Sequence, residues 1–151
     1  MIVDVFDISK DLNRVMEMSR DMHAKSLFSA LELNENKALR MFMDADEGNG
    51  NPYYFRVVRD NGVAIAFMVA VAGAHFCSDD LYSIDLLIWV DVDYRGTEAG
   101  ALLRDGYSAW ADEIGVTLCM IGSTTGINMN RSLKFFQAGG FELVGHNLVR
   151  S

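Results

Sequence analysis

The stretch WVDVDYRGTEAG, Trp89–Gly100, marks the point where an apolar run stops and a helix begins. The run ends at Val90, two aspartates follow, and Arg95-Gly96 precedes apolar residues that recur with a helical period. A helix that starts directly after a strand presents unpaired backbone N–H groups and the positive end of its dipole, which together suit a phosphate group. The stretch therefore indicates an anion-binding turn, although Glu98 in the same turn would repel an anion.

A purely structural turn is the alternative interpretation, because short glycine-containing connections between strands and helices are common. Gly96 and Gly100 would let a ligand approach the backbone closely. Two familiar phosphate loops are missing from the chain. It contains neither G-x-x-x-x-G-K-[ST] nor G-x-G-x-x-G.

The segments around this turn alternate between strand and helix patterns. Apolar and β-branched residues predict strands over 1–8, 53–59, 63–73, 82–90, 116–122 and 141–149. The Asp60–Gly62 sequence DNG predicts a tight hairpin between the second and third of these. Apolar positions at helical spacing predict a helix capped by Ser9, a second from about Asn34, and further helices near 99–114 and 130–140.

This order predicts an α/β fold in which a mixed, twisted central sheet carries helices on both faces. The strand-helix-strand unit at 82–122 is expected to be a parallel crossover. No repeat or linker divides the chain, so residues 1–151 are expected to form a single domain. The strand predicted at 116–122 is expected to be buried, and the last strand, 141–149, could pair across a homodimer.

The amino-acid composition indicates which kinds of partner and cellular location to expect. The net charge of −8, from 21 acidic and 13 basic residues, argues against nucleic acid. No apolar run reaches the ~20 residues of a membrane span, and the acidic N-terminus does not resemble a targeting peptide, so we expect a cytoplasmic protein. Cys77 and Cys119 lie in apolar runs without C-x-x-C spacing and are expected to be buried, reduced thiols.

Two segments resemble the Gcn5-related N-acetyltransferase (GNAT) family. Arg95 and Gly100 match the family's [QR]-x-x-G-x-[GA] turn, with Val90 ending the strand before it and Ala99 inside it. The second segment, NMNRSLKFFQAGGFELVG, is similar to the family's asparagine-containing helix that ends in Gly-Phe. The resemblance covers most of the chain and implies a GNAT-type α/β domain.

The resemblance also implies where acetyl-CoA would bind. The strand residues would pair with the pantetheine arm, the turn and helix start would hold the pyrophosphate, and the last helix would flank the thioester. The residues concerned are Ile88, Trp89 and Val90 for the arm; Arg95, Gly96, Thr97, Glu98, Ala99, Gly100 and Ala101 for the pyrophosphate; and Asn128, Asn130 and Phe136 for the thioester end.

Two residues depart from the family's pattern. Glu98 stands where the family usually has glycine, and its charge is expected to weaken binding of the pyrophosphate. Phe136 stands where the family often has a tyrosine that donates a proton, which phenylalanine cannot do. A thiol with a pKa of ~8.5 leaves readily as thiolate, so transfer remains feasible without that tyrosine.

The expected function is therefore transfer of an acetyl group from acetyl-CoA to a primary amine. Asp85 is the candidate base, because it interrupts an apolar strand and burial would raise its pKa. An aspartate on the solvated face, or one bonded across the sheet, is the alternative. The histidines and cysteines share no metal-binding spacing, so no metal site is expected.

Two other functions stay open at this stage. One is a non-catalytic acyl-CoA-binding or interaction module that kept the fold, which the departures at Glu98 and Phe136 would suit. The other is a nucleotide-binding regulator, which would bind phosphate without preferring the coenzyme A arm.

Overall fold

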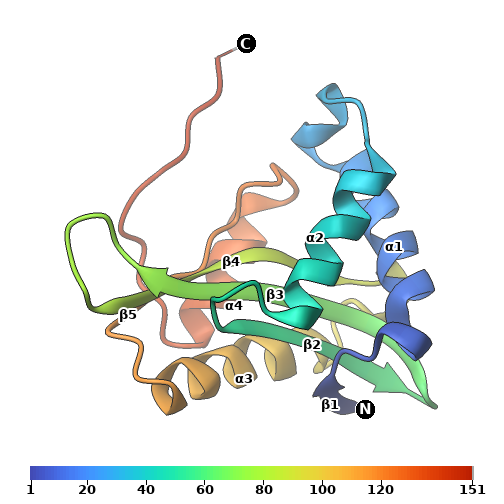
Figure 1. The fold of residues 1–151 in the computed structure, drawn as a ribbon. Coiled ribbons are helices and arrows are strands. Elements are labelled where there is room, and N and C mark those ends of the chain that lie inside the picture. Colours follow the sequence, from blue (N-terminus) through green and yellow to red (C-terminus); the bar gives the residue numbers. More distant parts are fainter. Residues whose placement is uncertain (151) are drawn as a thin grey trace.

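The computed structural model, which describes residues 1–150, contains one five-stranded sheet in the order β1-β2-β3-β4-β5 (Figure 1). The strands are β1 (Ile2–Val5), β2 (Tyr53–Asp60), β3 (Val63–Ala74), β4 (Leu81–Val90) and β5 (Leu118–Cys119). The first four run antiparallel to their neighbours, and β5 runs parallel to β4. The sheet is therefore mixed, and the crossover predicted at 82–122 is confirmed.

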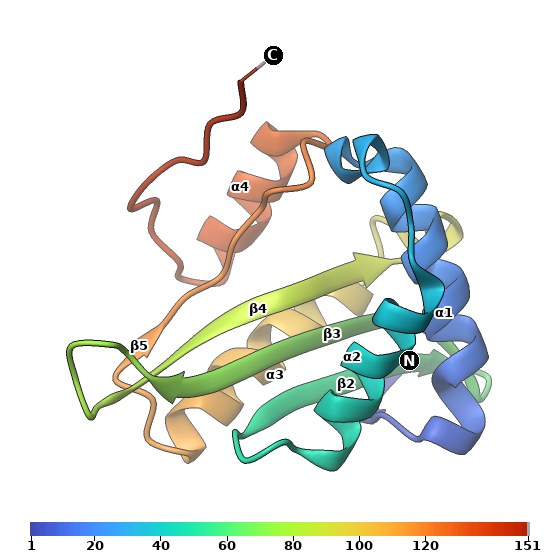
Figure 2. The ribbon, with the colours of Figure 1, turned by 45° about the horizontal axis from the view of Figure 1, so that its top comes forward.

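Helices cover both faces of this sheet, as predicted. They are α1 (Ile8–Lys25), α2 (Glu35–Glu47), α3 (Ala99–Glu113) and α4 (Met129–Ala138), with short 3₁₀ turns η1 (Leu27–Ala30) and η2 (Val92–Tyr94). Helices α1 and α2 lie on one face and α3 on the other (Figure 1). Helix α4 follows the long connection that leaves β5 (Figure 2).

The central strand β3 is apolar along its length because it is covered on both sides. Its residues 64–70 are all buried and divide between two cores. Phe67 and Val69 pack under α1 and α2, whereas Met68 and Ala70 pack against α3. The two-residue turn Asn61-Gly62 has positive φ at both positions, as a tight hairpin requires, so the predicted hairpin is confirmed.

The cap of the first helix differs from the prediction. Asp7, not Ser9, is the N-cap of α1, and its carboxylate accepts hydrogen bonds from both the N–H and the hydroxyl of Ser9. Asp and Ser are both good caps, so local propensity does not separate them. The backbone decides, because Asp7 is extended whereas Ser9 already lies within the helix.

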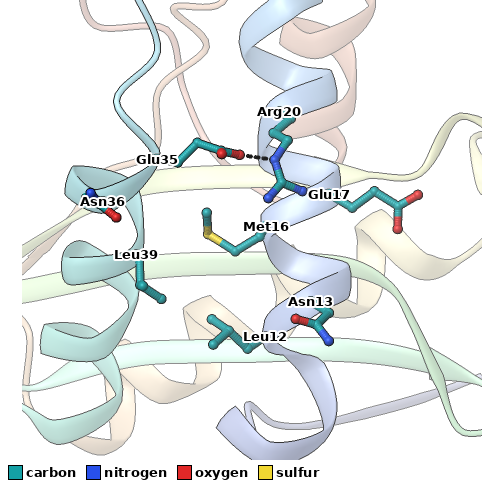
Figure 3. A pocket seen from close by; sticks show the side chains of 8 residues that line it. All are labelled: Leu12, Asn13, Met16, Glu17, Arg20, Glu35, Asn36 and Leu39. Carbon is teal, nitrogen blue, oxygen red and sulfur yellow. Dashed lines mark hydrogen bonds and ion pairs between the residues drawn. The ribbon is translucent and has the colours of Figure 1, made fainter.

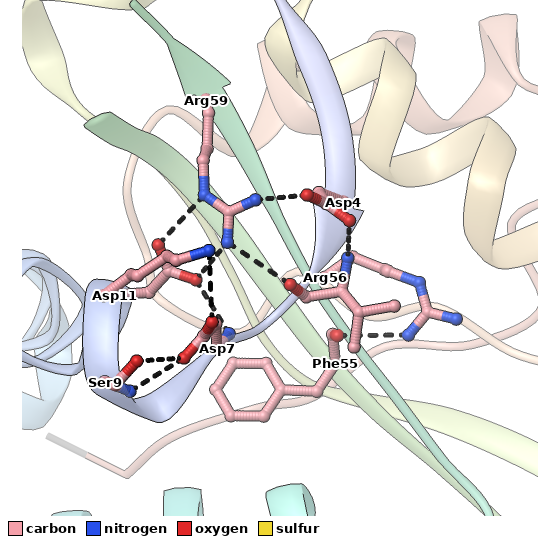
Figure 4. A network of polar contacts seen from close by, with 9 residues as sticks. Asp4, Asp7, Ser9, Asp11, Phe55, Arg56 and Arg59 are labelled. Carbon is pink, nitrogen blue, oxygen red and sulfur yellow. Dashed lines mark hydrogen bonds and ion pairs between the residues drawn. The ribbon is translucent and has the colours of Figure 1, made fainter. Parts of the chain in front are cut away.

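A buried ion pair fastens the start of α1 to the sheet (Figure 4). The Arg59 guanidinium on β2 donates to both carboxylate oxygens of Asp11, at 3.2 and 2.6 Å, and also pairs with Asp4 on β1. Asp11 is only 1% exposed, and its second oxygen also accepts the N–H of Asp7 at 2.8 Å. These contacts join β1, α1 and β2 at one end of the sheet.

The C-terminal part departs most from the sequence-based expectations. The strand predicted at 116–122 is reduced to Leu118–Cys119 and is half-exposed rather than buried. The strand predicted at 141–149 is wrong, since that segment forms no strand, and its residues from Glu142 onward are exposed. Without a neighbouring strand on its outer side, β5 lacks the partner that would bury it and extend it.

The two cysteines also differ from each other. Cys119 on β5 is half-buried and packs towards α3. Cys77 is exposed in the β3–β4 loop, where its sulfur lies 2.9 Å from the ring Nδ1 of His75, so the expected burial of Cys77 is wrong. Within residues 1–150, no helix is long and apolar enough to cross a bilayer.

Candidate functional site

Strand β4 has a free edge next to the predicted turn. Its pairing with β5 ends at Ser83–Cys119, followed by a bond from the Met120 N–H to the Ser83 carbonyl. Beyond that point, residues 84–90 pair with β3 on one side, and no strand among residues 1–150 pairs with them on the other. We call this side of residues 84–90 the open edge of β4 (Figure 2).

The register identifies which backbone groups point towards the open edge. The Asp91 N–H donates to the Ile65 carbonyl of β3, so alternate positions of the ladder, Trp89 and Leu87, also face β3. The N–H and C=O of Ile88 and Val90 therefore face the open edge. Of the three residues expected to pair with the pantetheine arm, Ile88 and Val90 direct their backbone groups to the open edge, whereas Trp89 does not.

A β-bulge interrupts β4 immediately before these residues. The register with β3 shifts between Val69 and Ala70, which leaves Leu86 without an opposite residue. Because one extra residue is inserted, Asp85 and Ile88 both direct their backbone groups to the same side of the strand. The bulge thus brings the acid and the free N–H groups onto one edge.

Asp85 is held by the chain that leaves β5. Its Oδ1 accepts the N–H of Gly122 at 2.7 Å, across the gap where β4 and β5 separate. Burial raises the pKa of the Asp85 carboxyl to about 6, and the hydrogen bond from Gly122 opposes this rise. A carboxylate with a pKa near neutrality can both accept and release a proton, as a general base must.

Tyr107 and Ser83 lie behind this acid, on the α3 side of the sheet. The Tyr107 hydroxyl oxygen lies 2.8 Å from the Ser83 hydroxyl and 2.8 Å from the carbonyl oxygen of Met120. Burial raises the pKa of Tyr107 far above its ordinary value, so its phenol keeps its proton. The pair joins α3 to both strands where they begin to separate.

The two aspartates in the stretch Trp89–Gly100, Asp91 and Asp93, have different surroundings. Asp91 forms an ion pair with Arg14 of α1 at 2.6 Å, and its other carboxylate oxygen accepts the N–H of Asp93 at 3.1 Å. The Arg14 Nε also donates to the carbonyl of Ala64 on β3. Asp91 therefore fastens the turn to α1, whereas Asp93 is exposed.

Arg95 lies against the end of β4. Its guanidinium stacks on the Trp89 ring at 4.5 Å, and its Nε donates to the Val90 carbonyl at 3.3 Å. Trp89 is buried on the α1–α2 side, and its ring N–H has no hydrogen-bond partner within residues 1–150. The exposed Arg95 side chain is thus held beside the open edge of β4, near the start of α3.

Thr97, rather than Glu98, caps α3 with its side chain. Its hydroxyl donates to the Tyr94 carbonyl at 2.6 Å and accepts the N–H of Ala99 at 3.3 Å. Glu98 has helical backbone angles and forms no capping hydrogen bond. The Glu98 carboxylate is exposed, which leaves it free to turn towards solvent.

Several N–H groups at the start of α3 have no partner within residues 1–150. The first helical bond runs from the Leu102 N–H to the Glu98 carbonyl. The free N–H groups belong to Gly96, Glu98, Gly100 and Ala101. Gly96 has φ +83° and open space around the position of a side chain, so an anion could approach there.

Helix α4 packs directly on this helix start. A side chain at Gly100 would meet the Phe135 ring at 3.1 Å, so the glycine permits close contact between α3 and α4. The Arg104 guanidinium lies over the same ring and donates to the Phe135 carbonyl at 2.7 Å. The packing of α4 on α3 therefore favours glycine at position 100, a role that the sequence motif alone does not reveal.

The remaining predicted residues, Asn128, Asn130 and Phe136, lie on α4. Asn128 and Asn130 are exposed, and Asn128 has a left-handed backbone with φ 43° at the helix start. Phe136 is buried and packs edge-to-face with Phe135. Phe136 thus has a structural role, and neither asparagine side chain is engaged elsewhere within residues 1–150.

A pocket of about 480 Å³ lies elsewhere, in the groove between α1 and α2 (Figure 3). Its lining residues are Leu12, Asn13, Met16, Glu17, Arg20, Glu35, Asn36 and Leu39. The ion pair between Arg20 and Glu35 spans it (Figure 3). None of the predicted site residues contributes to this pocket. Within residues 1–150, no three His, Cys, Asp or Glu side chains form a group able to hold a metal ion.

Solved structures with a similar fold include several N-acetyltransferases. A glucosamine-6-phosphate N-acetyltransferase from Arabidopsis thaliana has a TM-score of 0.75 at 11% identity, over 99% of this chain and 97% of that one. An aminoglycoside 6'-N-acetyltransferase from Acinetobacter haemolyticus has a TM-score of 0.75 at 13% identity, over 100% and 97%. A transcriptional regulator from Bacillus halodurans has a TM-score of 0.78 at 15% identity, over 99% and 98%.

These similarities confirm the GNAT fold that the two sequence segments predicted. No protein-family model matches the sequence, and no curated protein is similar enough in sequence to count as a relative. At identities of 11–15%, the structural similarity establishes the fold but not a substrate.

The sequence did not reveal two residues that position the site. Gly122 holds Asp85, and Arg14 holds Asp91 from 77 positions away in the chain. Gly122 is the last residue of the strand predicted at 116–122, which could have suggested a place near the sheet edge. Nothing in the helical pattern of α1 distinguished Arg14 from the other cations of that helix.

Proposed function

We propose that this protein transfers an acetyl group from acetyl-CoA to a primary amine. The observation that carries the proposal is the open edge of β4, whose free backbone groups run from Asp85 towards the turn before α3. Similarity to N-acetyltransferase folds supports the class of reaction. The amine acceptor and the residue roles below are part of the proposal.

The acetyl donor would bind along the open edge. The pantetheine arm would pair with the N–H and C=O of Val90 and with the C=O of Ile88, as an added strand does. This pairing leaves the Ile88 N–H free for the thioester oxygen. The pyrophosphate would accept hydrogen bonds from the N–H groups at Gly96, Glu98, Gly100 and Ala101. The Arg95 side chain, next to Gly96, would add a positive charge. Its Nε would first have to release the Val90 carbonyl, so that this carbonyl can pair with the pantetheine arm.

In the chemical step, the amine nitrogen attacks the thioester carbonyl carbon. A C–N bond forms, the C–S bond breaks, and coenzyme A leaves as a thiolate. The Ile88 N–H is oriented to stabilise the negative charge that develops on the carbonyl oxygen. Asp85, directly or through a water molecule, takes the proton that the amine must lose.

The test is calorimetric titration with acetyl-CoA, with NAD and ATP as controls at the same ionic strength, followed by a screen of primary amines. Saturable binding of acetyl-CoA alone, together with release of free thiol in the presence of an amine, would support the proposal. Absence of acetyl-CoA binding would refute it.

A non-catalytic acyl-CoA-binding module is the second candidate. Phe136 is buried and cannot donate a proton, and Glu98 brings a negative charge to the proposed pyrophosphate site. One of the similar folds belongs to a transcriptional regulator rather than a named enzyme. Binding of acetyl-CoA without thiol release from any amine in the screen would favour this candidate.

A further inference from the structure

Within residues 1–150, the main chain of the connection between β5 and α4, residues 121–127, is hydrogen-bonded to other elements at only two points. The Gly122 N–H donates to the Asp85 carboxylate on β4 at 2.7 Å. The Thr125 carbonyl accepts the N–H of Leu27, the first residue of η1, at 2.8 Å. The two bonds are three positions apart, so they hold the same short span of chain from two elements.

The Leu27 side chain also packs on this connection. Gly126 has φ +74°, and a side chain there would meet Cδ2 of Leu27 at 3.3 Å. Glycine at this position therefore lets the connection run close against η1, where the chain that follows α1 and the chain that leads into α4 lie side by side (Figure 2). The packing supports the hydrogen bond from the Leu27 N–H, because both fix the connection to the same residue.

The 3₁₀ turn η1 is itself fixed to the end of α1. Ser26 is buried, and its hydroxyl accepts the Phe28 N–H at 3.2 Å and donates to the His23 carbonyl at 3.1 Å. At the other end of η1, the His23 ring Nε2 lies 2.8 Å from the Leu31 carbonyl oxygen. These contacts hold both ends of η1, so the Leu27 N–H has a fixed direction.

We infer that Leu27 is a positioning residue for Asp85. Its N–H binds Thr125, and the span from Thr125 back to Gly122 is thereby held where the Gly122 N–H meets the carboxylate. Within residues 1–150, no other element donates a hydrogen bond to the Asp85 carboxylate, so this contact fixes its direction. The role of Asp85 as a base rests on the proposed acetyl transfer, whereas the path from Leu27 to Asp85 does not.

Replacing Leu27 by proline removes the N–H that binds Thr125. Proline has no N–H, fits the first position of a helical turn, and requires an extended residue before it. Ser26 meets this requirement with φ −92° and ψ 169°. Leu27→Ala is the first control, because it shortens the side chain but keeps the N–H.

Ile8→Pro is the matched control for the proline itself. Ile8 is the first residue of α1, follows the extended residue Asp7, and is 39% exposed against 44% for Leu27. The Ile8 N–H has no partner within residues 1–150. A change seen in Leu27→Pro but not in Ile8→Pro therefore comes from the lost bond to Thr125.

Hydrogen exchange of the Gly122 amide, followed by NMR, measures the effect without any substrate. Leu27→Pro should lower the protection of this amide about tenfold, which corresponds to the loss of one hydrogen bond, and should leave the amides of β3 unchanged. Leu27→Ala and Ile8→Pro should retain most of the protection. Unchanged protection in Leu27→Pro would overturn the inference. An equal loss in β3 would overturn it too, because the bond would then only stabilise the whole fold.

A double-substitution cycle tests whether Leu27 acts through Asp85. Leu27→Pro should lower kcat for acetyl transfer about 10- to 100-fold with little change in the KM for acetyl-CoA, because the base is displaced. In an Asp85→Asn background the same substitution should cause no further loss. An equal loss in both backgrounds would overturn the positioning role. Absence of transfer by the unsubstituted protein would instead refute the proposed function, and the exchange result alone would then decide the inference.

Ser26→Ala carries the same test if Leu27→Pro does not fold. The substitution removes the hydroxyl that caps η1 but leaves the Leu27 N–H, so the protection of the Gly122 amide should fall by a smaller factor, about two- to fivefold. Unchanged protection of Gly122 in Ser26→Ala would then overturn the inference.

Discussion

The two edges of the sheet differ in how completely their polar groups are paired. At the β1 edge, Arg59 lies between Asp4 and Asp11 and joins two strands to α1 (Figure 4). At the other end, β5 is two residues long, and the neighbouring β4 has free backbone groups beyond Ser83. The paired end therefore serves stability, and the unpaired end is where we place donor binding.

The buried aspartates at the two ends of the sheet, Asp11 and Asp85, differ in the same way. Asp11 is almost fully buried but is neutralised by the arginine that it faces. Within residues 1–150, Asp85 has backbone N–H groups but no cation as its partner, and burial raises its pKa to about 6. We therefore propose that a reactive acid in this fold must be buried and must also lack a charged partner.

The largest effect on activity should come from replacing Asp85. Asp85→Asn should lower kcat/KM for acetyl transfer by about 10²- to 10⁴-fold, because the amine loses its base, while acetyl-CoA affinity stays the same. Steady-state kinetics and calorimetry measure the two quantities. The control is Asp93→Asn, which removes an exposed carboxylate from the turn after β4. Unchanged turnover in Asp85→Asn would exclude Asp85 as the base.

At the paired edge, stability should suffer instead. Asp11→Ala should lower the free energy of unfolding by about 3–5 kcal/mol, because Arg59 would be left without its buried partner. Denaturant unfolding measures this loss. Glu35→Ala breaks the half-exposed pair with Arg20 and should cost no more than about 1 kcal/mol. Equal losses of unfolding free energy in the two variants would mean that burial does not make the Asp11–Arg59 pair more important than the Glu35–Arg20 pair.

The pH dependence of stability should separate the two ends further. Because the folded pKa of Asp85 is about 6 against 3.8 when unfolded, ionisation favours the unfolded chain. The protonated carboxyl of Asp85 stabilises the folded chain fully below pH 3.8, and this stabilisation is lost as the pH rises through 6. Asp85→Asn should therefore gain about 1–3 kcal/mol relative to the unsubstituted protein between pH 4 and pH 7.

Denaturant unfolding of both proteins at several pH values measures this gain. Asparagine can still accept the Gly122 N–H, so the comparison isolates the charge. A difference in unfolding free energy that does not change with pH would show that Asp85 titrates normally.

The smallest effect concerns the charge at the start of α3. Glu98→Gln should tighten acetyl-CoA binding about two- to fivefold, which corresponds to the ~0.3–1 kcal/mol of a charge near a helix terminus. Titration calorimetry at low ionic strength measures it. Glu113→Gln, at the opposite end of the same helix, should leave the affinity unchanged. Weaker binding in Glu98→Gln would mean that the carboxylate assists the donor.

The antiparallel centre of the sheet could be predicted from the sequence with good boundaries. Residues 53–59, 63–73 and 82–90 carry their strand pattern locally, and Asn61-Gly62 specifies a tight turn by its backbone preferences. The helix after Gly96 and its free N–H groups were likewise predictable, because strand-to-turn-to-helix patterns depend on neighbouring residues. These features determined the fold class and suggested an anion site.

Tertiary structure alone decided which side chains meet. The contact between Asp85 and Gly122 joins residues 37 apart, and that between Arg14 and Asp91 joins residues 77 apart. Periodicity reports the face on which a residue lies but not its partner on another element. The same reason explains the wrong strand at 141–149, whose pattern is suited to pairing but specifies no edge to pair with.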